Sequence, residues 1–204
     1  MAADGTGDRP LLTTVPPGCT DLTRPAFGDR PRVQLVLPCL DPSTGETTLN
    51  AVTPDGAVFE VVDRGVLSDP ALTPDGRFVI YWKADGGGEG GTLYRAPLNG
   101  PDVPVNITAG GDERDNDAAV SPIGDVVAFT RAGQGIWTVG LGGANLNTQL
   151  TKQNGDQDPS WSPDGSRITF KRQDQLWVMD ADGGNPRRIS APGDVGTAAA
   201  WSPR

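Results

Sequence analysis

A phrase of sequence that returns along the chain constrains the fold more than any other feature. Residues 158–170 read DPSWSPDGSRITF, and related phrases begin at Asp69, at Asp117 and, incompletely, at Ala198. Spacings of 48, 41 and 40 residues separate the turn prolines of these copies, Pro74, Pro122, Pro163 and Pro203. A period of about 40–50 residues is typical of a four-stranded propeller blade.

Three further columns of the repeat make coincidence untenable. An aromatic residue stands seven positions after each proline: Tyr81, Phe129 and Phe170. An apolar–aromatic pair follows: Leu93-Tyr94, Ile136-Trp137 and Leu176-Trp177. An apolar–hydroxyl pair ends each copy: Ile107-Thr108, Leu150-Thr151 and Ile189-Ser190. Short apolar segments separated by Gly, Pro, Asn and Asp turns read as strands, so the sequence predicts an all-β propeller of four-stranded blades.

The repeat also sets the expected domain boundaries. Residues 1–30 are expected to form an extended N-terminal arm, and residues 31–204 the β-propeller domain. Four blades are recognisable, at about 32–67, 69–108, 117–151 and 158–190. In the first blade Pro54-Asp55-Gly56 is expected to join the third and fourth strands. A last strand at 198–202 either closes a ring against the N-terminal blade or leaves an open arc.

The motif D-x-x-W-S-P-D-G, followed by LWVMDADGG at 176–184 and RRIS at 187–190, resembles the TolB-like β-propeller repeat of the WD40-like class. The resemblance covers about residues 32–204. It implies a ring of about six blades, of which this chain would supply part. It also implies a protein–protein interaction scaffold of the bacterial cell envelope, in the periplasm or outside the cell.

Two other classes of function stay open. Propellers of this type also occur in prolyl-oligopeptidase-type serine peptidases, so this chain can be the propeller portion of such an enzyme. The remaining alternative is a small-ligand or cation binder at the mouth of the channel.

Composition narrows the partners and the compartment. The net charge of −9 repels phosphate backbones, which argues against nucleic acid. The apolar runs are too short to insert into a membrane. Residues 1–10 lack the charged and apolar regions of a signal peptide, so a cytoplasmic location stays open beside the periplasmic one. Cys19 and Cys39 are candidates for a disulfide in an oxidising compartment.

The chain contains no histidine, and this excludes most catalytic centres. Ser–His–Asp and Cys–His nucleophile activation both require it, as do histidine-containing metal sites. We therefore predict that the chain is not an enzyme and needs no cofactor. Weak calcium binding is the one metal interaction considered, at the acid-rich turns 112–117, 156–158 and 180–184, where a solvated turn is the simpler interpretation.

Charged columns supply the candidate partner-binding residues. Acids stand five residues before each proline, at Asp69, Asp117 and Asp158, and bases nine residues after it, at Lys83, Arg131 and Arg172. Both columns are expected at the same rim of the blades, either as ion pairs or as a charged surface that receives a partner. Trp161 is expected in the core between blades, whereas Trp82 lies outside the columns and is the candidate for an exposed contact.

Overall fold

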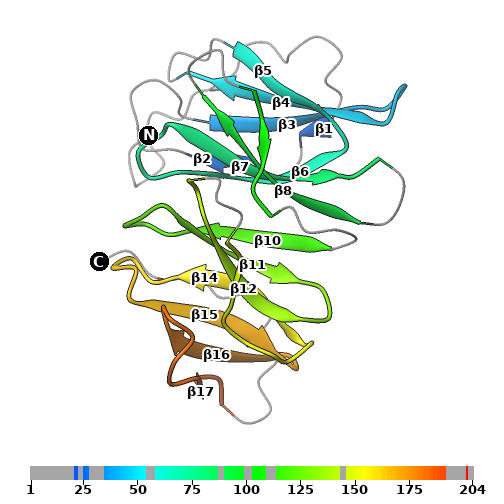
Figure 1. Ribbon diagram of the computed structural model, residues 1–204. Helices are drawn as coiled ribbons and strands as arrows, with labels where there is room; N and C mark the ends of the chain where they lie inside the picture. The colour runs from blue at the N-terminus through cyan, green and yellow to red at the C-terminus, as the bar shows by residue number, and fades with distance from the viewer. Residues whose placement is uncertain are drawn as a thin grey trace.

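The computed structural model describes residues 21–22, 25–27, 35–53, 58–86, 90–98, 103–108, 114–142, 146–191 and 201. These residues form seventeen β-strands arranged in four antiparallel sheets (Figure 1). Within this part of the chain, no helix is long and apolar enough to cross a bilayer. The all-β prediction is confirmed.

Each sheet is one blade, and the blades follow one another along the molecule (Figure 1). Blade one contains β1 (Asp21–Leu22), β2 (Ala26–Phe27), β3 (Leu35–Asp41), β4 (Glu46–Val52) and β5 (Val58–Gly65). Blade two contains β6 (Leu67–Leu72), β7 (Phe78–Ala84), β8 (Gly91–Pro97) and β9 (Val105–Asn106). Blade three contains β10 (Asp115–Val120), β11 (Val126–Arg131), β12 (Gly135–Gly140) and β13 (Thr148–Gln149). Blade four contains β14 (Asp156–Trp161), β15 (Arg167–Arg172), β16 (Gln175–Asp180) and β17 (Arg187–Arg188).

Blade one begins earlier than the repeat suggested. Strands β1 and β2 pair with β3, which places them in the inner position of the sheet, within the segment expected to be an arm. Strands β4 and β5 are then the third and fourth strands. The turn at Pro54-Asp55-Gly56 lies between them but falls outside the described residues, as do residues 1–20 and most of 192–204.

The Ser/Thr-Pro-Asp-Gly turn is held by its aspartate. The carboxylate of Asp164 accepts a hydrogen bond from the Ser162 hydroxyl at 2.6 Å and from the Ser166 N–H at 3.1 Å. Asp75 makes the same two contacts in blade two. Such Asx turns satisfy backbone donors that a strand end leaves without a partner. Blade three has Ile123 at this position, and its side chain is 70% exposed.

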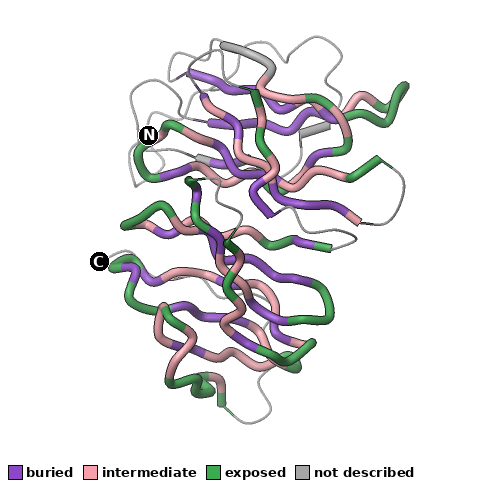
Figure 2. The backbone as a smooth tube through the Cα atoms, viewed as in Figure 1, coloured by how far each residue is buried: buried purple, intermediate pink, exposed green. Residues whose placement is uncertain are grey.

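The core lies between the blades. Figure 2 shows the buried backbone running through the middle of each sheet and the exposed backbone at the turns. The aromatic column that follows the turn is fully buried: Tyr81, Phe129 and Phe170. Each of these rings belongs to a separate apolar cluster, one at each junction between successive blades.

The hydroxyl column closes each blade. The side-chain oxygen of Thr108 accepts the Leu93 N–H at 3.0 Å, and Thr151 accepts the Ile136 N–H at 3.0 Å. Ser190 does the same for the Leu176 N–H at 3.3 Å. This contact ties the segment after the short fourth strand to the third strand, which explains why a hydroxyl recurs there.

One tryptophan contact repeats between blades. Trp161 is half-buried rather than enclosed, and its indole N–H donates to the Ala119 carbonyl of blade three at 3.0 Å. Trp201 donates in the same way to the Ser160 carbonyl of blade four at 3.1 Å. Ala119 and Ser160 hold the same repeat position, so Trp201 meets blade four as Trp161 meets blade three.

Candidate functional site

The basic column is stacked on the aromatic columns. The Arg131 guanidinium carbon lies 5.3 Å from the centre of the Phe129 ring and 4.7 Å from that of Trp137. In blade four, Arg172 lies 5.1 Å from the Phe170 ring and 4.5 Å from the Trp177 ring. Strand pairing explains the arrangement, because the two aromatic residues of each blade are direct cross-strand partners. The delocalised guanidinium favours such stacking.

Each arginine also forms a two-pronged ion pair with an aspartate on the inner strand. Arg131 donates to the two carboxylate oxygens of Asp115 at 2.8 and 3.0 Å. Arg172 donates to those of Asp156 at 2.6 and 2.7 Å. Both aspartate side chains are fully buried, and the arginine side chains are 4% and 12% exposed.

These pairs correct the expected geometry. The acid that pairs with each arginine stands seven residues before the proline, not five, because Asp115 and Asp156 are the cross-strand partners of Arg131 and Arg172. Buried arginines also present little charge to a partner. The two arginines of the basic column are therefore internal clamps rather than parts of an exposed rim.

Blade two builds its clamp from a different acid. Lys83 donates to Asp63 at 2.7 Å, and the Tyr81 hydroxyl donates to the same carboxylate oxygen at 2.6 Å. Asp63 lies on β5, so this contact joins blades one and two. Burial alone would raise the pKa of Asp63, but the hydrogen bonds from Lys83 and Tyr81 outweigh it and hold the pKa below its ordinary value. Burial and the Asp63 carboxylate raise the pKa of Tyr81 far above its usual range.

The acidic column has its own backbone conformation. Asp69, Asp117 and Asp158 have φ values of 49°, 51° and 55°, in the left-handed region. Each stands at an irregularity in the pairing of the first two strands of its blade. Aspartate enters this region more readily than most residues, so the bulge accounts for the recurring acid.

The carboxylates of Asp69 and Asp158 act electrostatically on the carboxylate of Asp117, which lies on the inner strand between theirs. Burial raises the pKa of the Asp117 carboxyl, and the negative charges of Asp158 and Asp69 raise it further. Hydrogen bonds from the Thr130 hydroxyl and the Asp158 N–H oppose this rise without cancelling it. The Thr130 hydroxyl in turn accepts the Asp158 N–H at 3.2 Å, which links blades three and four.

The acidic column remains accessible to solvent. Asp69 and Asp117 are exposed and Asp158 is half-exposed, whereas the clamp acids Asp115 and Asp156 are buried. Burial thus raises the pKa of Asp117 although the residue as a whole stays exposed. The result is a row of negative charge on the inner strands, separate from the clamps.

The other predicted site residues are placed as follows. Trp82 is half-buried against the core between blades two and three, and a Cβ atom at Gly91 would lie 2.3 Å from its ring, so Trp82 is not an exposed contact.

Cys39 is buried on β3 and disulfide-bonded. Its pairing with Cys19 stays a prediction, because Cys19 lies outside the described residues.

No metal site forms within the described residues, where no three acidic or cysteine side chains converge on one point. In the turn at 180–184, the Asp180 carboxylate accepts from the Asn185 amide at 2.7 Å, and the Asp182 carboxylate accepts from the Gly184 N–H at 2.9 Å. These acids organise their own turn.

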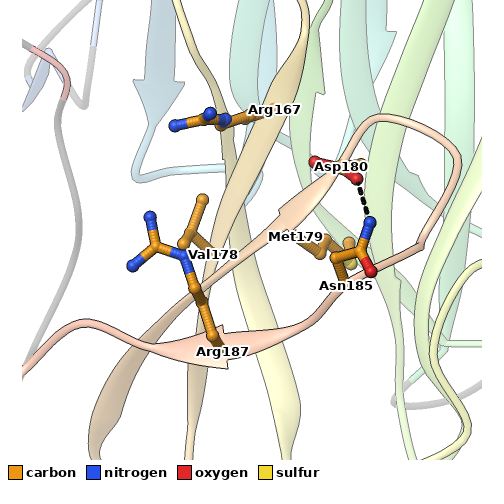
Figure 3. Close-up of a pocket in the computed structure, with 6 residues that line it drawn as sticks. All are labelled: Arg167, Val178, Met179, Asp180, Asn185 and Arg187. Atoms are coloured by element: carbon orange, nitrogen blue, oxygen red, sulfur yellow. Dashed lines mark hydrogen bonds between the residues drawn. The ribbon is translucent and has the colours of Figure 1, made fainter.

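Two grooves open on the sheets of blades three and four. The smaller groove, about 220 Å³, lies on blade four. Figure 3 shows the side chains of Arg167 and Arg187 beside Val178. On the other side of the groove the Asn185 amide donates a hydrogen bond to Asp180. The larger, about 530 Å³, lies between blades three and four and is lined mainly by apolar surface, with Trp161 as one wall.

The sequence reading missed the clamp acids and the larger groove. A signal for the acids was present, because Asp115-Asn-Asp117 and Asp156-Gln-Asp158 recur as spaced pairs. The acid of blade two carried no such signal, since Leu67 occupies the corresponding position and Asp63 comes from the preceding blade. The groove depends on how two blades meet, which no single repeat reveals.

Comparison with known proteins fits this architecture. No protein-family model matches the chain. It is 39% identical over 74 residues to Tol-Pal system protein TolB 1 of Novosphingobium aromaticivorans, a match covering 33% of this chain and 16% of the relative. It is 39% identical over 83 residues to Tol-Pal system protein TolB of Rhizorhabdus wittichii, covering 37% of this chain and 18% of the relative.

Solved structures extend the likeness to most of the chain. The putative TolB of Agrobacterium tumefaciens superposes with a TM-score of 0.67 at 22% identity, over 84% of this chain and 62% of that one. This chain is a TolB-like β-propeller. A puromycin hydrolase shares the fold with a TM-score of 0.70 at 18% identity, over 89% of this chain and 32% of the hydrolase. Each of these matches covers less than two thirds of the length of the relative.

Proposed function

We propose that this TolB-like propeller is a non-catalytic protein-interaction scaffold of the bacterial cell envelope, in the periplasm or outside the cell. The observation that carries the proposal is the division of charge on the inner strands. The bases are locked in clamps, and the column formed by Asp69, Asp117 and Asp158 stays open to solvent. Burial is the largest cause of the raised pKa of Asp117, and a partner with a basic surface would relieve the repulsion that Asp158 and Asp69 add to it.

Two further observations support the envelope setting. The relatives are Tol-Pal system proteins by name, which associates them with an assembly rather than a reaction. The disulfide at Cys39 suits an oxidising compartment.

The test is affinity capture from a cell-envelope extract with the acidic column neutralised. The triple variant Asp69→Asn, Asp117→Asn and Asp158→Asn keeps residues that tolerate the left-handed backbone. The matched control removes three exposed acids elsewhere, by Glu46→Gln, Asp85→Asn and Asp174→Asn. We expect the wild type and the control to retain one specific protein in a salt-dependent way, and the triple variant to lose it. Equal retention by all three proteins would refute the role of the acidic column.

A second candidate rests on the hydrolase neighbour. The propeller of a prolyl-oligopeptidase-type enzyme would fold as this chain does, and this chain lacks histidine. Incubation of the purified chain with aminoacyl p-nitroanilides tests whether the chain itself is catalytic. We expect no release of nitroaniline above the background rate, and turnover proportional to protein concentration would overturn the non-catalytic proposal.

The cation-binding alternative has a separate test. Ligands that bind only the folded state raise its melting temperature. We expect millimolar calcium to leave the melting temperature of the purified chain unchanged relative to magnesium, and a calcium-specific rise would favour a cation site.

A further inference from the structure

The groove between blades three and four has the size and surface of a side-chain pocket. Its volume of about 530 Å³ falls among those of small-ligand sites. Val126 and Leu150 line it from blade three, and Trp161 lines it from blade four. The Trp161 indole N–H is already satisfied by Ala119, so the ring offers an apolar edge to the groove.

At the edge of the groove, blade three lacks an aspartate that stabilises the turn in two other blades. In blades two and four the turn carries Asp75 or Asp164, which bonds a hydroxyl and a backbone N–H. Blade three keeps a hydroxyl residue, Ser121, at the first of these positions, but it has Ile123 where the other two blades have the acid. The isoleucine gives up those hydrogen bonds and leaves its side chain 70% exposed on the rim. Part of it rests on Gly165, where a Cβ atom would lie 2.4 Å away.

The corresponding groove on blade four is not apolar. Counted from the turn proline, Arg167 takes the place of Val126, and by strand pairing Arg187 takes the place of Thr148. Figure 3 shows both arginines beside Val178. The apolar surface found between blades three and four is therefore not repeated on blade four.

Charge around the larger groove restricts its occupant. None of its lining residues is basic, and Asp182 lies on its wall. Asp125 and Asp164 are exposed and adjoin the lining residues Val126 and Gly165. An apolar side chain bound here would thus be followed by chain that passes several carboxylates.

We infer that this groove docks a partner segment through an apolar side chain, of leucine size, next to a lysine or arginine. The inference rests on the proposed role as a protein-interaction scaffold, but it places this contact away from the acidic column. An acidic or purely polar segment does not fit, since it would meet like charge or leave the apolar walls exposed.

Short peptides test the occupant directly. Acetyl-Gly-Leu-Lys-Gly-amide, its Ala-Lys analogue and its Leu-Glu analogue are titrated into the isotopically labelled chain. We expect the Leu-Lys peptide to shift the Trp161 indole and the Gly165 amide in a saturable way. Loss of the leucine side chain should weaken binding about tenfold or more. The Leu-Glu peptide should bind several-fold more weakly, with the difference shrinking in 0.5 M salt.

The substitution Ile123→Asp tests the groove from the protein side. The new carboxylate restores the turn chemistry of the other blades, so the melting temperature should be equal or higher while the Leu-Lys peptide no longer binds. Val103→Asp is the matched control, because Val103 is 72% exposed and lies outside the groove. It should leave peptide binding unchanged.

Failure of the inference and failure of the proposed function are separable. Equal binding of the Leu-Lys and Ala-Lys peptides, or unchanged binding by Ile123→Asp, would overturn the groove. Because the peptide series uses the wild type, it decides the matter even if a variant folds poorly. Capture of an envelope protein by the acidic column would stand regardless of that result. A groove that binds the Leu-Lys peptide in a chain that captures no envelope protein would instead refute the scaffold proposal.

Discussion

Blades two and three place the same basic column against the same aromatic column, yet they satisfy it differently. Arg131 pairs with Asp115 inside blade three, whereas Lys83 pairs with Asp63 across the junction between blades one and two. The arginine pair is two-pronged and buried; the lysine makes a single contact, and its side chain is 27% exposed.

The difference teaches which part of the repeat is obligatory. The cation stays beside the aromatic rings in both blades, at 4.7 Å from Trp137 and 5.3 Å from Tyr94. The source of the acid changes. A cation over buried rings requires a nearby carboxylate, and the chain supplies one from wherever the backbone brings it close.

The largest effect should follow from breaking the buried pair of blade three. Arg131→Met leaves Asp115 without its main partner in a site closed to water. An uncompensated buried charge of this kind costs about 3–5 kcal/mol. Denaturant unfolding followed by tryptophan fluorescence measures the loss.

The double variant Arg131→Met with Asp115→Leu is the control, because replacing both partners with apolar residues removes the unpaired charge. It should recover most of the lost stability. If the single variant loses less than about 1 kcal/mol, the pair is not a clamp and the contrast with blade two disappears.

A smaller loss is expected for the clamp between blades one and two. Asp63→Asn removes the charge that accepts from Lys83 and Tyr81, and hydrogen bonds to charged groups contribute about 1.5–3 kcal/mol. The pH dependence has a definite sign. The folded state holds the pKa of Asp63 below 3.8, so its stabilisation is present above pH 3.8 and is lost as the pH falls through the lower folded value.

Urea unfolding at pH 7 and at pH 3 or below checks this prediction. The wild type should exceed Asp63→Asn in stability at pH 7, and the gap should narrow at the acidic pH. A constant gap would indicate that the carboxylate charge is irrelevant and that only packing changed.

The sequence predicted what a single repeat encodes. The turn, the strand order and the aromatic column all depend on residues close together in the chain. Tyr81, Phe129 and Phe170, which the repeat places in one column, are all buried. The acid partners depend on strand register. A bulge between Gln157 and Ser160 shifts the pairing by one residue, so that Asp156 rather than Gln157 faces Arg172. Counting residues along a regular strand cannot anticipate such a bulge.

Contacts between blades could not be predicted from the repeat alone. Asp63 meets Lys83 because blade one stacks on blade two, and the apolar groove forms where Ile123 meets the turn of blade four. The inner strand of blade one carries none of the repeat motifs, so the sequence predicts an arm where its two short pieces lie. Each of these features arises from contacts between segments that are far apart in the sequence.

A modest loss of stability is expected when either of the two tryptophan contacts between blades is removed. Trp161→Phe and Trp201→Phe each keep a large ring and remove one indole hydrogen bond, to Ala119 and to Ser160. Each loss should be about 0.5–1.5 kcal/mol. Thermal unfolding measures both, and equal losses would indicate that the two junctions are alike. No loss for Trp201→Phe would show that this contact does not stabilise the blade.

The smallest effect in this series is a gain in stability, and it is expected within blade three itself, where two acids two residues apart behave oppositely. Asp115 forms an ion pair with Arg131, whereas burial and the negative charges of Asp158 and Asp69 raise the pKa of Asp117. Because the folded pKa lies above the ordinary value of 3.8, ionisation of Asp117 progressively disfavours folding as the pH rises from 3.8 through the folded value. Asp117→Asn removes the charge and keeps a residue that tolerates φ near 51°. Its melting temperature should therefore exceed that of the wild type at pH 7. The advantage should vanish below pH 3.8, where the acid is protonated in both the folded and unfolded states.

An Asn variant that is less stable than the wild type at pH 7 would show that the carboxylate holds the bulge. The acidic column would then be a structural element like the clamps, and its availability to a basic partner would be lost with it.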